Sequence, residues 1–147
     1  MAEEKIANIM REFVKTMETG DVEKGLSLVT EDVEWVTPNG TFKGKGEVRR
    51  LLSAEPMQGS TVTETGNGII VEGNKAFFEH VIASTFRGRK AEVLAMCAYE
   101  FKGDKIQKVR VVMDRLLMAQ QATGGLPKMM VNLIVKQSEK MFRIGKG

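Results

Sequence analysis

The sequence predicts an α+β fold in which a strongly curved antiparallel sheet carries helices on one face. Apolar residues recur at helical spacing near the N-terminus, whereas β-branched and aromatic residues dominate residues 60–115, where glycine turns recur. Helices followed by a run of strands are typical of α+β domains, with the helices packed against one face of the sheet. Because long antiparallel strands twist and curl, the sheet and its helices should enclose a cone.

The predicted helices precede most of the sheet. Residues 3–19 place apolar side chains at helical spacing, and Gly20 can adopt the left-handed conformation that ends a helix. Asp21 can cap a second, short helix that includes Val29. A third short helix around Leu51 is predicted to follow the Gly-Lys-Gly segment.

The strands are predicted from alternation and from turns. Residues 33–37 alternate with a period of two, and a Pro-Asn-Gly turn reverses the chain after them. Further strands are expected over residues 61–65, 68–72, 75–87, 90–101 and 106–115. Their joins are short glycine-containing turns, so neighbouring strands should be antiparallel. After a Gly-Gly loop, Pro127 can begin a final amphipathic helix that reaches Phe142.

Length and composition indicate one domain. The chain has 147 residues, of which 42% are hydrophobic and 28% charged. We expect residues 1–122 to form the domain and residues 123–147 to add a C-terminal amphipathic helix to it. A single cysteine and a single histidine exclude an internal disulfide and are too few for a zinc site. The charged N-terminus lacks the apolar region of a signal peptide, and no apolar run is long enough to span a membrane, so a cytoplasmic location is expected.

The net charge of +3 is unevenly distributed. The segment from Leu126 to Gly147 has five basic residues and one acidic residue, which leaves the first 125 residues at −1. The basic segment is best interpreted as the solvated face of a helix. The sequence therefore predicts neither a nucleic-acid partner nor a membrane partner.

Two stretches carry a resemblance to a known family. FVKTMETGDVEKGLSLVTEDVEWVTPNGTFKGKGEVRRLL contains an opening helix, a Gly-Asp junction, a tryptophan-bearing strand and a Gly-x-Gly entry to the third helix. EFKGDKIQKVRVVMDRLLMAQQ contains the last hairpin and ends in R-x-x-x-D and glutamines. In this order they resemble the SnoaL-like branch of the NTF2-like superfamily, which includes polyketide cyclases, ketosteroid isomerases and limonene-epoxide hydrolases. The resemblance covers residues 1–122 and implies an NTF2-like cone with an internal pocket.

The resemblance does not carry over the catalytic groups of two of these enzymes. Ketosteroid isomerases use a tyrosine and two aspartates, and the matching positions hold Phe13, Thr37 and Cys97. Limonene-epoxide hydrolases use two aspartates bridged by an arginine, and those positions hold His80, Ile82 and Val111. Neither mechanism is therefore expected here.

Three residues remain as candidates for proton transfer. Alternation places His80 and Tyr99 in apolar rows on one face of their strands, and the resemblance implies that these faces point into the cone. There the imidazole suits acid–base work and the phenol could orient a carbonyl. The resemblance adds Asp114, because an aspartate on the last strand acts as acid and base in cyclases of this group. The structural alternatives are a hydrogen-bonded core histidine, a core tyrosine, and an aspartate that caps the strand end or pairs with Arg110 or Arg115.

The sequence predicts a pocket for a small apolar or polycyclic molecule and catalysis without cofactor or metal. The expected reaction is a proton transfer of the cyclase, isomerase or dehydratase kind, and the alternative is a non-catalytic ligand-binding or dimerisation module. The residues expected to line the pocket are Trp35, Thr37, Phe13, Phe78, Ile82, Cys97 and Val111.

A homodimer is also expected, because the outward face of the sheet is apolar. The outward residues are Phe77, Val81, Ala83, Leu94, Met96 and Ala98. The C-terminal helix should dock on apolar surface, either at the mouth of the cone or across a partner subunit.

Overall fold

The computed structural model describes residues 2–54 and 57–143. The helices are α1 (Ala2–Thr19), α2 (Val22–Ser27), α3 (Gly44–Leu52), α4 (Arg115–Ala122) and α5 (Gly125–Arg143). The strands are β1 (Val29–Thr37), β2 (Gly40–Lys43), β3 (Thr61–Glu72), β4 (Lys75–Phe86), β5 (Arg89–Lys102) and β6 (Lys105–Met113). The predicted α+β class is confirmed.

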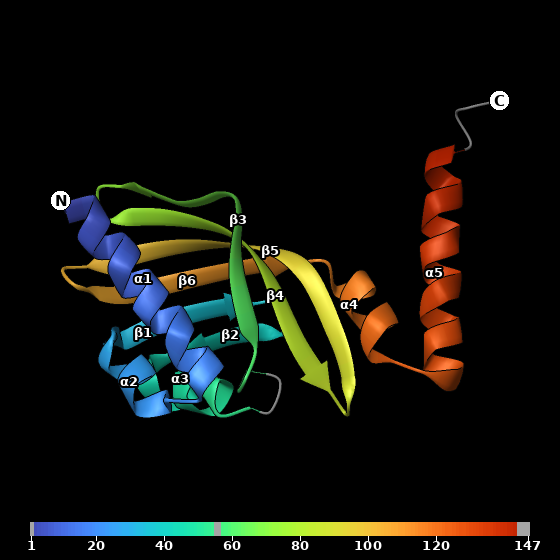
Figure 1. The fold of residues 1–147 in the computed structure, drawn as a ribbon, viewed down its shortest axis with the longest axis horizontal. Helices are drawn as coiled ribbons and strands as arrows, with labels where there is room; N and C mark the ends of the chain where they lie inside the picture. The colour runs from blue at the N-terminus through green and yellow to red at the C-terminus, as the bar shows by residue number, and fades with distance from the viewer. Residues whose placement is uncertain (1, 55–56, 144–147) are drawn as a thin grey trace.

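The strands form one curved, open sheet in the order β2-β1-β6-β5-β4-β3 (Figure 1). The predicted hairpins join β3 to β4, β4 to β5 and β5 to β6, and each of these pairs is antiparallel. The pair of β1 and β6 is parallel, with Trp35 opposite Val109, so the sheet is mixed. Sequence reasoning missed this pair, because no turn signal links two strands so far apart in the chain.

Residues 61–72 form one bent strand where two were predicted. The pairing of β3 with β4 shifts register between Glu64 and Ile69, and Gly66 in this interval has a φ of +58°. The Glu79 carboxylate on β4 accepts a hydrogen bond from the Asn67 backbone N–H at 3.0 Å. The glycine that predicted an end of the strand therefore lies in a β-bulge, and a side chain of β4 holds this bulge in place.

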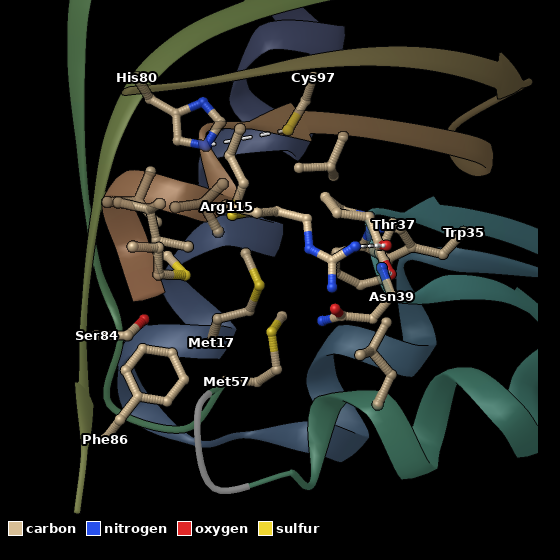
Figure 2. A pocket seen from close by; sticks show the side chains of 18 of the residues that line it. Met17, Trp35, Thr37, Asn39, Met57, His80, Ser84, Phe86, Cys97 and Arg115 are labelled. Atoms are coloured by element: carbon tan, nitrogen blue, oxygen red, sulfur yellow. Dashed lines mark hydrogen bonds between the residues drawn. The ribbon is translucent and has the colours of Figure 1, made fainter. Parts of the chain in front are cut away.

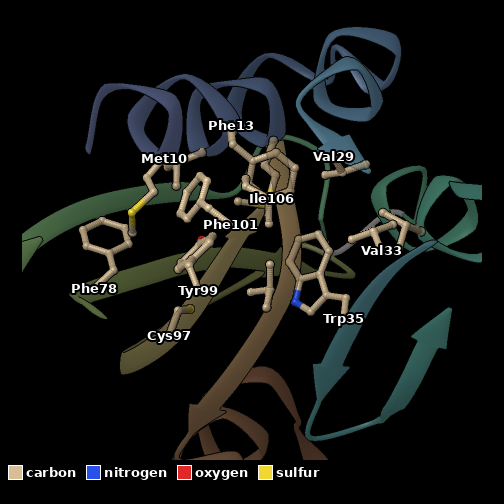
Figure 3. Packing of buried hydrophobic residues seen from close by; sticks show 14 of the residues in the cluster. Met10, Phe13, Val29, Val33, Trp35, Phe78, Cys97, Tyr99, Phe101 and Ile106 are labelled. Carbon is tan, nitrogen blue, oxygen red and sulfur yellow. The ribbon is translucent and has the colours of Figure 1, made fainter. Parts of the chain in front are cut away.

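The core lies between the concave face of the sheet and the N-terminal helices. The apolar side of α1 is buried over the sheet, and the Phe13 ring lies 5.4 Å from the Trp35 ring (Figure 3). Ile106 and Val109 of β6 are fully buried below them. The helix α3 covers the other end of the sheet at β1. The N-terminal helices therefore cover the concave face of the curved sheet, as predicted.

Residues 115–122 form a helix, α4, that was not predicted as an element. The Asp114 side chain accepts a hydrogen bond from the Leu117 N–H at 2.9 Å and so caps the helix. The Gln121 side chain then bonds the backbone of Glu92 in both directions, which fastens α4 to β5. The last strand thus turns directly into a helix at the open end of the cone.

The helix α5 stands away from the sheet (Figure 1). It is joined to α4, where the Gln120 side chain donates to the Asn132 side chain at 2.7 Å. Its apolar side chains remain exposed, namely Leu126, Met129, Met130, Leu133, Ile134, Met141 and Phe142. The expected docking of this helix therefore does not take place within one chain. Within the described residues, no helix combines the length and apolar character needed to cross a membrane.

Candidate functional site

A cavity of about 350 Å³ lies between the concave face of the sheet, α1 and α4 (Figure 2). Its walls are mostly apolar, with methionines from α1, the segment after α3, and α4. A volume of this size is typical of a small-molecule pocket. Of the residues predicted for the site, the cavity brings together His80, Tyr99, Trp35, Thr37, Ile82, Cys97 and Val111.

Three predicted site residues lie outside the cavity. Phe13 is fully buried in the core, where it supports Trp35 from behind. Phe78 stacks on the His80 ring with the ring centres 4.3 Å apart. Asp114 is exposed and caps the start of α4, a structural role that differs from the strand-end cap or arginine pair given as its alternative. The two phenylalanines therefore pack behind Trp35 and His80 and support these cavity residues without lining the cavity themselves.

His80 is the buried basic group of the cavity. Its Nδ1 lies 3.3 Å from the Phe78 carbonyl oxygen, and its Nε2 lies 3.9 Å from Cys97 Sγ (Figure 2). Because a carbonyl can only accept, Nδ1 carries the proton and Nε2 keeps its lone pair. Burial lowers the pKa of the imidazole below 6.5, against the opposing effect of the Phe78 carbonyl. His80 is therefore neutral at neutral pH and can accept a proton at Nε2.

Cys97 and Tyr99 follow each other on the inward face of β5. Burial raises the pKa of the Cys97 thiol to about 12, so the thiol is not a nucleophile near neutral pH. Burial, together with the neighbouring Cys97, raises the pKa of Tyr99 well above 10. The phenol therefore keeps its proton and can only act as a hydrogen-bond donor or acceptor.

Arg115 at the mouth of the cavity was missed by sequence reasoning. Its guanidinium reaches across to the turn between β1 and β2, where Nη1 donates to the Pro38 carbonyl oxygen at 3.0 Å (Figure 2). Thr37 and Asn39 lie next to it, and the Thr37 hydroxyl donates to the Gly40 carbonyl at 3.1 Å. The signal that could have located Arg115 is the cap Asp114 before an apolar run, which marks a helix start.

The cavity has few groups that can take part in acid–base or metal chemistry. Among its described lining residues there is no aspartate or glutamate, and His80 is the group that titrates near neutral pH. Within residues 2–54 and 57–143, no three His, Cys, Asp or Glu side chains gather to hold a metal ion. The arrangement can bind an apolar molecule, accept a proton at His80 and donate a hydrogen bond from Tyr99.

Comparisons with known proteins bear on this fold. Residues 10–109 match the family described as SnoaL-like domain. No functionally curated protein matches the chain.

Solved structures share the architecture. A putative SnoaL-like polyketide cyclase from Jannaschia sp. CCS1 superposes with a TM-score of 0.71 at 11% identity, covering 84% of this chain and 95% of that one. A hypothetical protein from Catenulispora acidiphila with a ketosteroid isomerase-like fold, in complex with trimethylamine, superposes with a TM-score of 0.70 at 15% identity. The match covers 78% of this chain and 91% of that one. TerC co-crystallised with polyporic acid superposes with a TM-score of 0.70 at 17% identity, and the match covers 80% of this chain and 98% of that one. At these identities the likeness concerns the fold.

Proposed function

Because the chain belongs to the SnoaL-like domain family, we propose that its cavity binds a small apolar molecule and moves a proton on it without a cofactor. The reaction is of the isomerase, cyclase or dehydratase kind. The observation that carries the proposal is the neutral His80 imidazole, whose unprotonated Nε2 lies in an apolar cavity. A group of this kind is suited to general base catalysis near neutral pH.

The reaction begins with removal of a proton from a carbon next to a carbonyl. His80 Nε2 takes the proton, the electron pair of the broken C–H bond moves into the enolate, and the imidazole becomes an imidazolium. Tyr99 donates a hydrogen bond to the enolate oxygen, because its raised pKa keeps its proton in place. The imidazolium then returns the proton to another carbon or to a leaving oxygen. The apolar walls strengthen both steps by excluding water.

The second candidate function is ligand binding without turnover. Two observations favour it: the cavity has no carboxylate among its described lining residues, and the Nε2 of His80 is partly occupied by the Cys97 thiol at 3.9 Å. In this reading His80 is a core histidine that the Phe78 carbonyl satisfies.

Exchange of deuterium into an enolisable two-ring ketone tests the proposal. Incubation of 2-tetralone with the protein in D₂O, followed by NMR, should show exchange above the rate in buffer. His80→Gln should lower the protein-dependent rate by about 10²–10⁴-fold and Tyr99→Phe by about 10²–10³-fold, with melting temperatures showing that both variants fold.

The variant Asp114→Asn tests whether Asp114, the other residue predicted to act as acid and base, transfers the proton. Asparagine caps helices as well as aspartate does, so α4 stays in place while the carboxylate is lost. Loss of exchange in Asp114→Asn, with His80→Gln active, would transfer the role to Asp114. Saturable binding of the ketone without any exchange would favour the binding module.

We also propose that a second copy of the chain covers the outer face of the sheet. Ile70, Phe77, Leu94 and Val112 are exposed there, so each of the strands β3 to β6 contributes an apolar side chain to this face. Ile70 pairs with Phe77, and Val112 pairs with Met96. Monomers rarely expose such a patch. Light scattering at micromolar concentration should give the mass of a dimer, and Leu94→Lys should give a monomer. A monomeric wild-type protein would refute the proposal.

A further inference from the structure

Arg115 is the one side chain with a permanent charge among the described residues that line the cavity. A guanidinium has five N–H donors, and its hydrogen bond to the Pro38 carbonyl uses one of them. No carboxylate of the described residues lies within ion-pairing distance of it. The neighbouring Asp114 carboxylate accepts from the Leu117 N–H. The positive charge is therefore not neutralised within this part of the chain.

Both ends of the Arg115 side chain are held in place. Its backbone is fixed by the capped start of α4, and its guanidinium is fixed by the turn between β1 and β2 (Figure 2). The first turn of a helix disfavours a cation, because the N-terminal end of the helix dipole is itself positive. Arg115 therefore costs α4 stability while it concentrates positive potential at the mouth of an apolar cavity.

We infer that the molecule bound in the cavity carries an anionic oxygen group, a carboxylate or an acidic enol, which Arg115 binds at the mouth. The inference rests on the proposed function and names the class of its substrate. An arginine fork matches two oxygens of a carboxylate or of a vicinal enolate, and this geometry fixes orientation as well as affinity. The apolar body of the molecule then extends along Trp35 and Val111 toward His80. The anchored head selects which carbon of the body reaches the Nε2 atom.

A matched pair of three-ring probes tests the inference. Anthraquinone-2-carboxylate and the neutral anthraquinone-2-carboxamide differ in charge and have the same apolar body. The chain contains one tryptophan, Trp35, and it lines the cavity, so quenching of its fluorescence reports binding at this site. We expect the acid to bind at least about tenfold more tightly than the amide and to weaken as salt is added.

Three variants separate the anion site from a structural tie. Arg115→Gln should abolish the preference for the acid, and Arg115→Lys should restore part of it. Arg50→Gln removes the same charge from an exposed position on α3 and should leave the preference unchanged. Melting temperatures of all three variants report whether α4 and the β1–β2 turn remain joined.

Each other outcome counts against a specific statement. If both probes bind equally well and Arg115→Gln changes neither, the anion site is wrong and the apolar cavity stands. If Arg115→Gln weakens both probes alike and lowers the melting temperature, Arg115 is a structural tie only. If neither probe quenches Trp35, the proposed function fails and the inference fails with it.

Discussion

At the scale of single residues, burial of His80 couples the stability of the fold to pH. Its pKa lies below 6.5 in the folded state and near 6.5 in the unfolded chain, so the unfolded state binds more protons between these two values. The free energy of unfolding should therefore decrease as the pH falls below about 6.5, and this contribution stops changing below the folded-state pKa. Urea unfolding of wild type and His80→Gln at pH 7 and pH 5 measures it. The difference between pH values should be smaller in the variant, and equal differences would contradict the assignment.

Cys97 should be nearly inert toward thiol reagents in the folded protein. With a pKa of about 12, the fraction of thiolate at pH 8 is on the order of 10⁻⁴, and the side chain is buried. Modification by a chromogenic disulfide reagent should be slow in buffer and fast in urea, and a ligand of the cavity should slow it further. Complete modification within seconds in buffer would show that the cavity opens widely.

Alternation could predict which residues share a face with His80 on β4 and with Cys97 and Tyr99 on β5, because the two strands pair in unbroken register. That these faces point inward was implied by the family resemblance. Alternation does not indicate whether an inward side chain reaches the cavity or is covered by a helix. Phe78 lies in the same inward row as His80, yet α1 covers it and removes it from the cavity. Arg115 begins a helix, where the period of two no longer applies, and its direction could not be predicted.

At the scale of elements, the Asp114 cap should determine the stability of α4. Asp114→Ala removes the acceptor for the Leu117 N–H and should cost about 0.5–2 kcal/mol, whereas Asp114→Asn should cost much less. Urea denaturation and amide hydrogen exchange in α4 measure the difference. If alanine and asparagine destabilise the protein equally, the carboxylate has a role other than capping.

A side chain at Gly66 should destabilise the bulge in β3. This residue has a φ of +58°, and an added Cβ would collide with the Glu79 carboxylate that holds the bulge. Gly73 in the β3–β4 turn has a similar φ of +60° and open space around it. Gly73→Ala should therefore cost only the backbone strain, about 1–2 kcal/mol, and Gly66→Ala should cost more. Equal losses in urea denaturation would show that Glu79 moves aside freely.

The elements that the sequence predicted well are those whose ends are marked by a glycine signal in the adjoining residues. The β5–β6 turn at Gly103 separates two strands that the structure reproduces closely, and α1 ends before Gly20 as expected. The bulge at Gly66 carries the same glycine signal as a turn, and only the carboxylate on the neighbouring strand distinguishes them. The helix α4 has eight residues and none of them is buried, so its sequence shows no clear apolar period.

At the scale of the whole molecule, α5 should contribute to stability through a second copy of the chain. Its apolar residues are exposed in one chain, and covering each would be worth roughly 1.5–3 kcal/mol. A chain that ends at Gly124 should melt at a lower temperature than the full chain. It should still bind the anthraquinone probes, because no described residue of α5 lines the cavity. An unchanged melting temperature would mean that α5 stays in solvent.

The parallel pair of β1 and β6 sets the order in which a newly made chain can fold. Residues 38–104 must leave the ribosome before β6 can take its place beside β1. Until then Trp35 has no neighbour on that side, and the apolar stripe of α1 has only part of the surface that it covers in the finished protein. Pairing between such distant segments is slow, because a long loop must close before the contact forms. The helix α1 packs on β3 and α2 as well as on the core, so its buried surface is completed only when β6 has joined the sheet, and its full resistance to proteases should appear at that step.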